Sequence, residues 1–153
     1  MGAFNFIAAL AAVINGLGIV RWLNSLADFF KRKDSMDIEY YWVFTLASLF
    51  QFVLHVLFWW TLWGIRDAGT LNFVTYLYLL VGPILLFLGS AFMAPEIEGD
   101  RLNMKHHYYA VRTVYADLLI LVWLWSSLAS LVFRRALPDS LPVLITFILI
   151  ALV

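Results

Sequence analysis

The sequence contains no cysteine, which excludes disulfides, thiolate nucleophiles, iron–sulfur clusters and cysteine-bound zinc. Charge is also scarce: 13% of the residues are charged, against about a quarter in an ordinary soluble domain. Basic and acidic residues balance, so the composition gives no basic footprint for nucleic acid. We find no Ser-His-Asp order, no phosphate-cradling loop and no carboxylate pair at a catalytic depth. An enzyme is therefore the least expected class, and no catalytic residue is assigned.

What the chain has in excess is apolar residues, at 64% of the total. This excess excludes a water-soluble fold. A membrane-spanning helix needs about 20 residues, so 153 residues hold four or five spans and no separate soluble domain. We therefore expect an all-α polytopic transmembrane helix bundle, with residues 1–153 forming one transmembrane domain.

Four apolar stretches are long enough to cross a bilayer, at about residues 4–30, 41–64, 70–93 and 108–133. Gly82-Pro83 interrupts the third, where a kink is expected. A fifth apolar stretch begins after Asp139 or Ser140, either of which can cap a helix with Pro142 in its first turn. At about 1.5 Å per residue it reaches only about 21 Å, against a hydrocarbon core of about 30 Å. We expect it to be incomplete, re-entrant or completed by a partner.

The distribution of basic residues predicts the orientation in the membrane. The first and third loops hold most of them: Lys31, Arg32, Lys33, Arg101 and Lys105. The other flanks hold Arg66, Arg134 and Arg135. The positive-inside rule then places the N-terminus outside the cytoplasm. The first apolar stretch has no basic segment before it and no obvious cleavage site, so we interpret it as a retained helix.

The informative residues are the polar ones inside the apolar stretches, because placing a polar side chain in hydrocarbon costs free energy. Arg21, Asn24, Ser25 and Asp28 fall within about a 100° arc of the first helix, and this stripe must face protein or water.

In the second helix Ser48, Gln51 and His55 share a face. Counting from the cytoplasmic ends places Arg21 level with Asp117 of the fourth helix, and Asp28 level with Arg112. We expect a charge ladder between the first and fourth helices, with Arg21 opposite Asp117 and Asp28 opposite Arg112. Gln51 is expected at the depth of the Arg21–Asp117 pair, and His55 one turn deeper.

Two interpretations of these residues stay open. In one, the charges pair simply to fix which helix packs on which, since removing one partner would strand a buried charge. In the other, Arg21, Gln51, His55 and Asp117 line a hydrated pathway or pocket in which His55 titrates near neutral pH.

Other features carry weaker signals. His106 and His107 follow Glu96, Glu98 and Asp100, but no spaced metal motif is present, and we assign no metal. Haem is poorly supported because His55 lies well inside the membrane while His106 and His107 lie at its edge. No cofactor is expected, although quinone or lipid binding near Trp42, Tyr108 and Tyr109 stays open. The sequence Gly16-x-Gly18 and the small residues Gly82, Gly89 and Ser90 permit close helix packing.

The order of features resembles that of a family of small, uncharacterised multi-pass proteins of bacterial inner membranes. The resemblance rests on Phe4-Asn5-Phe6 with Gly16 and Gly18, a basic loop, a Trp-rich second helix, and His107-Tyr108-Tyr109-Ala110-Val111-Arg112 at the start of the fourth. It covers about residues 4–135. It implies an inner-membrane location and a chain that continues past residue 153, and it transfers no activity.

Two functions follow as hypotheses. The first is a small oligomeric channel or transport-type protein with a polar constriction at Arg21, Gln51, His55 and Asp117. The alternative is a non-conducting accessory or scaffold subunit of a larger membrane complex. The expected partners are the lipid bilayer and either further copies of the chain or other membrane subunits.

Overall fold

The computed structural model describes residues 3–66, 73–95 and 101–132, and it is an all-α transmembrane bundle. The helices are α1 (Ala3–Arg32), α2 (Trp42–Gly64), α3 (Phe73–Met93) and α4 (Met104–Val132). All four are long and apolar enough to cross a membrane, as the sequence predicts. The predicted fifth helix lies outside the described residues.

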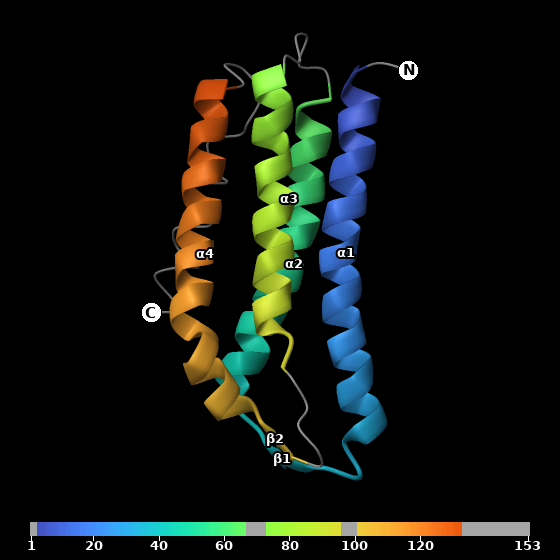
Figure 1. Ribbon diagram of the computed structural model, residues 1–153, viewed down its shortest axis with the longest axis vertical. Coiled ribbons are helices and arrows are strands. Elements are labelled where there is room, and N and C mark those ends of the chain that lie inside the picture. The colour runs from blue at the N-terminus through green and yellow to red at the C-terminus, as the bar shows by residue number, and fades with distance from the viewer. Residues whose placement is uncertain (1–2, 67–72, 96–100, 133–153) are drawn as a thin grey trace.

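The helix α3 occupies the centre of the bundle. Figure 1 shows α1 on one side of α3, α4 on the other, and α2 behind, and α3 contacts all three. Its buried positions recur at spacings of four and three, the heptad pattern that favours closely aligned helices. This series is Thr75, Leu79, Gly82, Leu86, Gly89 and Met93, and the neighbouring Pro83 and Ser90 are buried as well. The prediction of α1 beside α4 is therefore wrong, because α3 lies between them.

The proline in α3 does not end the helix, which runs continuously through Pro83 to Met93. The adjacent Gly82 lies against Trp125 of α4, where a Cβ atom would come within 2.6 Å of the indole ring. Trp125 stacks on Tyr78 with ring centroids 5.4 Å apart and donates its indole N–H to the Tyr78 carbonyl at 2.8 Å. The Tyr78 hydroxyl donates in return to the Trp125 carbonyl. These contacts join α3 to α4 beside the proline.

A short parallel sheet closes one end of the bundle, where the sequence predicted only polar loops. Strand β1 (Asp37–Glu39) pairs with β2 (Arg101–Asn103), with Ile38 opposite Leu102. Leu102 is buried while its neighbours are exposed, so the sheet turns its apolar centre toward the bundle. Asn103 then accepts the backbone N–H of His106 at 2.7 Å and caps α4.

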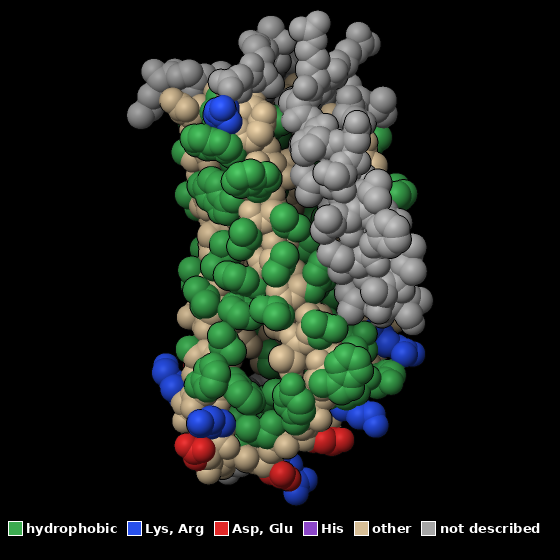
Figure 2. Space-filling view, turned by 180° about the vertical axis from the view of Figure 1, so that it is seen from behind, with side chains coloured by type: hydrophobic (Ala, Val, Ile, Leu, Met, Phe, Trp, Pro, Cys, Tyr) green, Lys and Arg blue, Asp and Glu red, His purple; other side chains and the backbone are tan. Residues whose placement is uncertain are grey.

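The surface has the distribution expected of a membrane-embedded bundle. Figure 2 shows hydrophobic side chains along most of one face, with basic and acidic side chains gathered mainly at the end that carries β1 and β2. The exposed apolar residues include three tryptophans near the opposite end, Trp59, Trp60 and Trp63. Amphipathic aromatic rings at such a level are typical of a membrane interface.

Candidate functional site

Three helices meet at a buried polar cluster centred on His55. Its Nδ1 lies 2.6 Å from Asn15 Oδ1 on α1, and its Nε2 lies 2.7 Å from Ser90 Oγ on α3. The Asn15 side-chain amide donates to the His55 carbonyl at 3.3 Å, so its oxygen faces the imidazole. Because that oxygen can only accept, Nδ1 carries the proton, and Nε2 of a neutral ring accepts from the Ser90 hydroxyl.

Two glycines allow the helices to come this close. A Cβ atom on Gly18 would lie 2.3 Å from His55 Cε1 and 3.3 Å from the Cα of Phe87 on α3. On α3, a Cβ on Gly89 would lie 2.8 Å from the Gln51 side-chain amide. These glycines are therefore required by packing, which confirms the close approach that the small residues predicted. Gly16 has open space instead, with nothing within 4 Å of a Cβ.

The cluster continues one turn along α2, where Gln51 Nε2 donates to the Leu86 carbonyl of α3 at 2.8 Å. Asn15 and His55 are 0% exposed, and Gln51 and Ser90 are 1% exposed. In the part of the chain that the structure describes, no buried polar side-chain atom lacks a hydrogen-bond partner. The cluster is thus a helix interface that is closed to solvent and in which the buried polar atoms are hydrogen-bonded. Its hydrogen bonds hold α1, α2 and α3 together.

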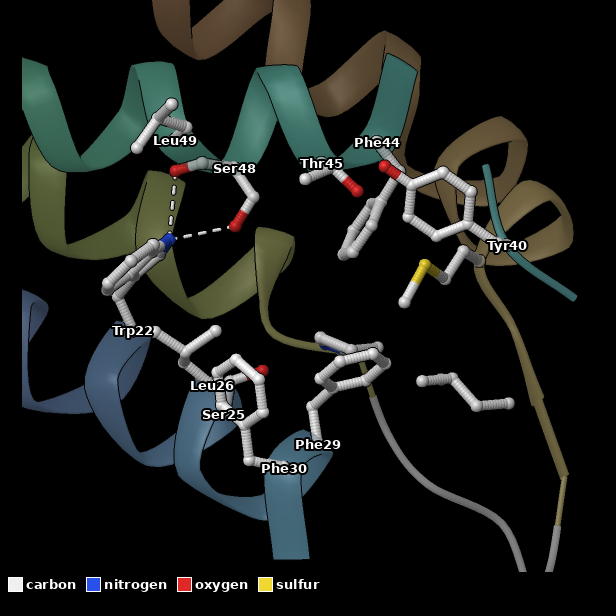
Figure 3. Close-up of a pocket in the computed structure, with 13 residues that line it drawn as sticks. Trp22, Ser25, Leu26, Phe29, Phe30, Tyr40, Phe44, Thr45, Ser48 and Leu49 are labelled. Carbon is white, nitrogen blue, oxygen red and sulfur yellow. Dashed lines mark hydrogen bonds between the residues drawn. The ribbon is translucent and has the colours of Figure 1, made fainter. Parts of the chain in front are cut away.

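A second contact between α1 and α2 lies closer to the charged end of the bundle. The Trp22 indole N–H points at Ser48 and lies 2.9 Å from its carbonyl oxygen and 2.8 Å from its hydroxyl, as Figure 3 shows. Beyond this contact an open cavity of about 300 Å³ lies between α1 and α2, with Leu102 of β2 and Met104 of α4 also in its lining. Rings of Phe29 and Phe44 project into it from the two helices (Figure 3). Its lining is mostly apolar, as in hydrophobic ligand pockets.

Tyrosines gather where α2 and α4 begin. The ring of Tyr41 lies 5.6 Å from that of Tyr108 and 6.2 Å from that of Tyr109. A hydrogen bond with Tyr109 raises the pKa of the Tyr41 hydroxyl above its ordinary value, with burial as a smaller cause. The Arg112 guanidinium lies 4.8 Å from the centre of the Tyr109 ring. This is the contact that Arg112 makes in place of the expected one with Asp28.

The structure separates the six residues that the sequence singled out. Gln51 and His55 are buried together on one face of α2, as predicted. Arg21 and Asp28 on α1, and Arg112 and Asp117 on α4, are exposed. Across residues 3–66, 73–95 and 101–132, neither Arg21 nor Asp117 forms an ion pair. The predicted charge ladder is wrong because α3 stands between α1 and α4.

His106 and His107 lie at the start of α4. The acidic residues that precede them in the sequence, Glu96, Glu98 and Asp100, lie outside the described residues. His106 and His107 line a cavity of about 620 Å³ between the end of α3 and the start of α4. His107 Nε2 lies 3.1 Å from the Phe92 carbonyl oxygen. Among the described residues no group of three or more metal-binding side chains comes together.

Sequence reasoning missed Asn15 and assigned Ser90 only to packing. Asn15 lies between Ala11 and Gly18 on the buried face of α1, and Ser90 is buried next to Gly89 on α3. The signal was present, since a strongly polar residue on an apolar heptad stripe needs a partner in a membrane. Which partner it takes depends on helix rotation and on the neighbouring helix.

Comparison of the chain with protein-family models, with curated proteins and with solved structures finds no match.

Proposed function

We propose that this protein is a non-conducting accessory or scaffold subunit of the membrane, which acts by packing against other membrane-embedded chains. The observation that supports this most is the sealed polar cluster. A transport path at the level of Gln51 and His55 needs water to reach them, and both are at most 1% exposed. All their polar atoms are used in contacts between helices.

The outer surface supports the same proposal. Asp117 stands in the membrane-spanning part of α4 among exposed apolar residues, including Val114 and Leu121. Arg21 stands in the same way beside Leu17 and Val20 on α1. An ionisable side chain facing hydrocarbon costs about 3 kcal/mol or more, and such residues normally face protein or water. A membrane-embedded partner on these faces would remove that cost.

For location we propose the bacterial inner membrane, with the N-terminus outside the cytoplasm. The basic residues Lys31 and Lys105 lie at the end of the bundle that carries β1 and β2, and so do Arg32, Lys33 and Arg101. The positive-inside rule favours the cytoplasm for that end. The resemblance to small inner-membrane proteins agrees with this assignment.

The test is a flux measurement on the purified protein in liposomes, with dyes that report protons and potassium. We expect flux equal to that of empty liposomes, because His55 and Gln51 are at most 1% exposed. A flux that the wild-type protein carries and that His55→Ala or Asp117→Asn abolishes, with the helical circular dichroism signal retained, would overturn the proposal. Lys33→Gln serves as the control, since it removes a charge outside the apolar part of α1.

A further inference from the structure

Two faces on opposite sides of the bundle carry complementary charges. One face runs along α1 with Val13, Leu17, Val20 and Arg21 exposed, and the other runs along α4 with Asp117 among exposed apolar residues. The α4 stripe contains Asp117, and the α1 stripe contains Arg21 with Asp28 about two turns nearer the charged end of the bundle. Arg21 on α1 and Asp117 on α4 have opposite charges.

The two charges also lie at matching depth. At about 1.5 Å per residue, Arg21 is about 16 Å along α1 from Arg32, and Asp117 is about 20 Å along α4 from Met104. Both of these helix ends lie at the end of the bundle closed by β1 and β2. The reach of the arginine side chain covers the difference of about 3 Å, which is about half a helical turn. Within one chain the two side chains cannot meet, because α3 lies between their helices.

We infer that the occupant of each face is a second copy of this chain. The α1 face of one copy contacts the α4 face of the next, so that Arg21 of one copy pairs with Asp117 of the next. This inference rests on the proposed function and names the partner. Two copies side by side in one membrane have the same orientation, so their charges stay at the same depth. A contact between two different faces repeats from copy to copy and produces rings or rows, rather than symmetric dimers.

The absence of cysteine makes the arrangement directly testable by cross-linking in native membranes. Leu17 lies one turn beyond Arg21 and Leu121 one turn beyond Asp117, both toward the same end of the bundle. They are 54% and 47% exposed. We expect a chain carrying both Leu17→Cys and Leu121→Cys to form a ladder of cross-linked dimers, trimers and larger species on copper-catalysed oxidation. An intramolecular bridge is excluded by α3.

The single-cysteine variants distinguish a contact between the α1 face and the α4 face from a symmetric contact. Leu17→Cys alone and Leu121→Cys alone should give no cross-link, whereas co-expression of the two should give dimers and no ladder. Adding Asp117→Asn to the double-cysteine chain should lower the cross-linked fraction by about tenfold or more, because it strands Arg21 in the interface. Exchanging the charges, with Arg21→Asp and Asp117→Arg together, should restore it. The control Lys33→Gln should leave the ladder unchanged.

Dimers formed by either single variant would overturn the inference in favour of a symmetric contact. Absence of cross-linking in the double-cysteine chain, with the bundle shown to be folded by circular dichroism, would overturn it in favour of a different partner or a monomer. The liposome flux measurement is independent of both results. A failed ladder with no flux would leave the accessory role standing without self-association, whereas flux by the wild-type protein would refute that role itself.

Discussion

Replacing Gly18 by alanine tests the polar cluster with the smallest possible change. The added Cβ would lie 2.3 Å from His55 Cε1 and 2.9 Å from Nε2, where ordinary contact begins at 3.4 Å. The imidazole would have to move by about 1 Å, unless α1 moves away from α2 and toward α3 instead. The second route also has a cost, because the Cα of Phe87 is 3.3 Å from the same Cβ.

Either movement breaks contacts that hold three helices together. Lengthening the bonds of His55 to Asn15 and Ser90 by about 1 Å, from 2.6 and 2.7 Å, removes them as hydrogen bonds. Hydrogen bonds between membrane helices contribute about 0.6 kcal/mol each, and overpacking costs about 1–3 kcal/mol. We therefore expect Gly18→Ala to lower the free energy of unfolding by about 2–4 kcal/mol.

The matched control is Gly16→Ala on the same helix, where the new Cβ meets nothing within 4 Å. Both changes give the same gain in helix propensity, so this gain cancels in the difference between them. The assay is equilibrium unfolding in mixed micelles with increasing SDS, followed by tryptophan fluorescence and circular dichroism. Equal stability of the two variants would refute the close packing of α1 on His55.

Two further predictions concern the other contacts between helices. Trp22→Phe removes the N–H that bonds to Ser48 but keeps a ring against Phe52, whose centroid is 4.8 Å away. It should cost about 1 kcal/mol in the same assay, and less when Ser48 is already alanine. Tyr78→Phe removes the hydroxyl that donates to the Trp125 carbonyl and should also cost about 1 kcal/mol. An undiminished stability would contradict the α3–α4 contact.

The sequence was sufficient to find the membrane-spanning helices. The predicted stretch 41–64 matches α2, Trp42–Gly64, and the predicted stretch 70–93 matches α3, Phe73–Met93. This agreement has a simple cause, since in hydrocarbon every backbone polar group must be satisfied within the helix. Gln51 and His55 were also predicted to share a face, because the period of a helix alone decides that.

The sequence did not decide which helix lies beside which. Arg21 and Asp117 have the right signs and depths for a pair, and only the position of α3 between α1 and α4 separates them. Likewise, the sequence showed that His55 needs hydrogen-bond partners inside a membrane, but it did not identify them. Asn15 and Ser90 reach it because Gly18 and Gly89 let three backbones approach closely. Apolar content and helical period are local properties of the chain, whereas partner choice depends on the order and rotation of the helices, which packing of all of them together determines.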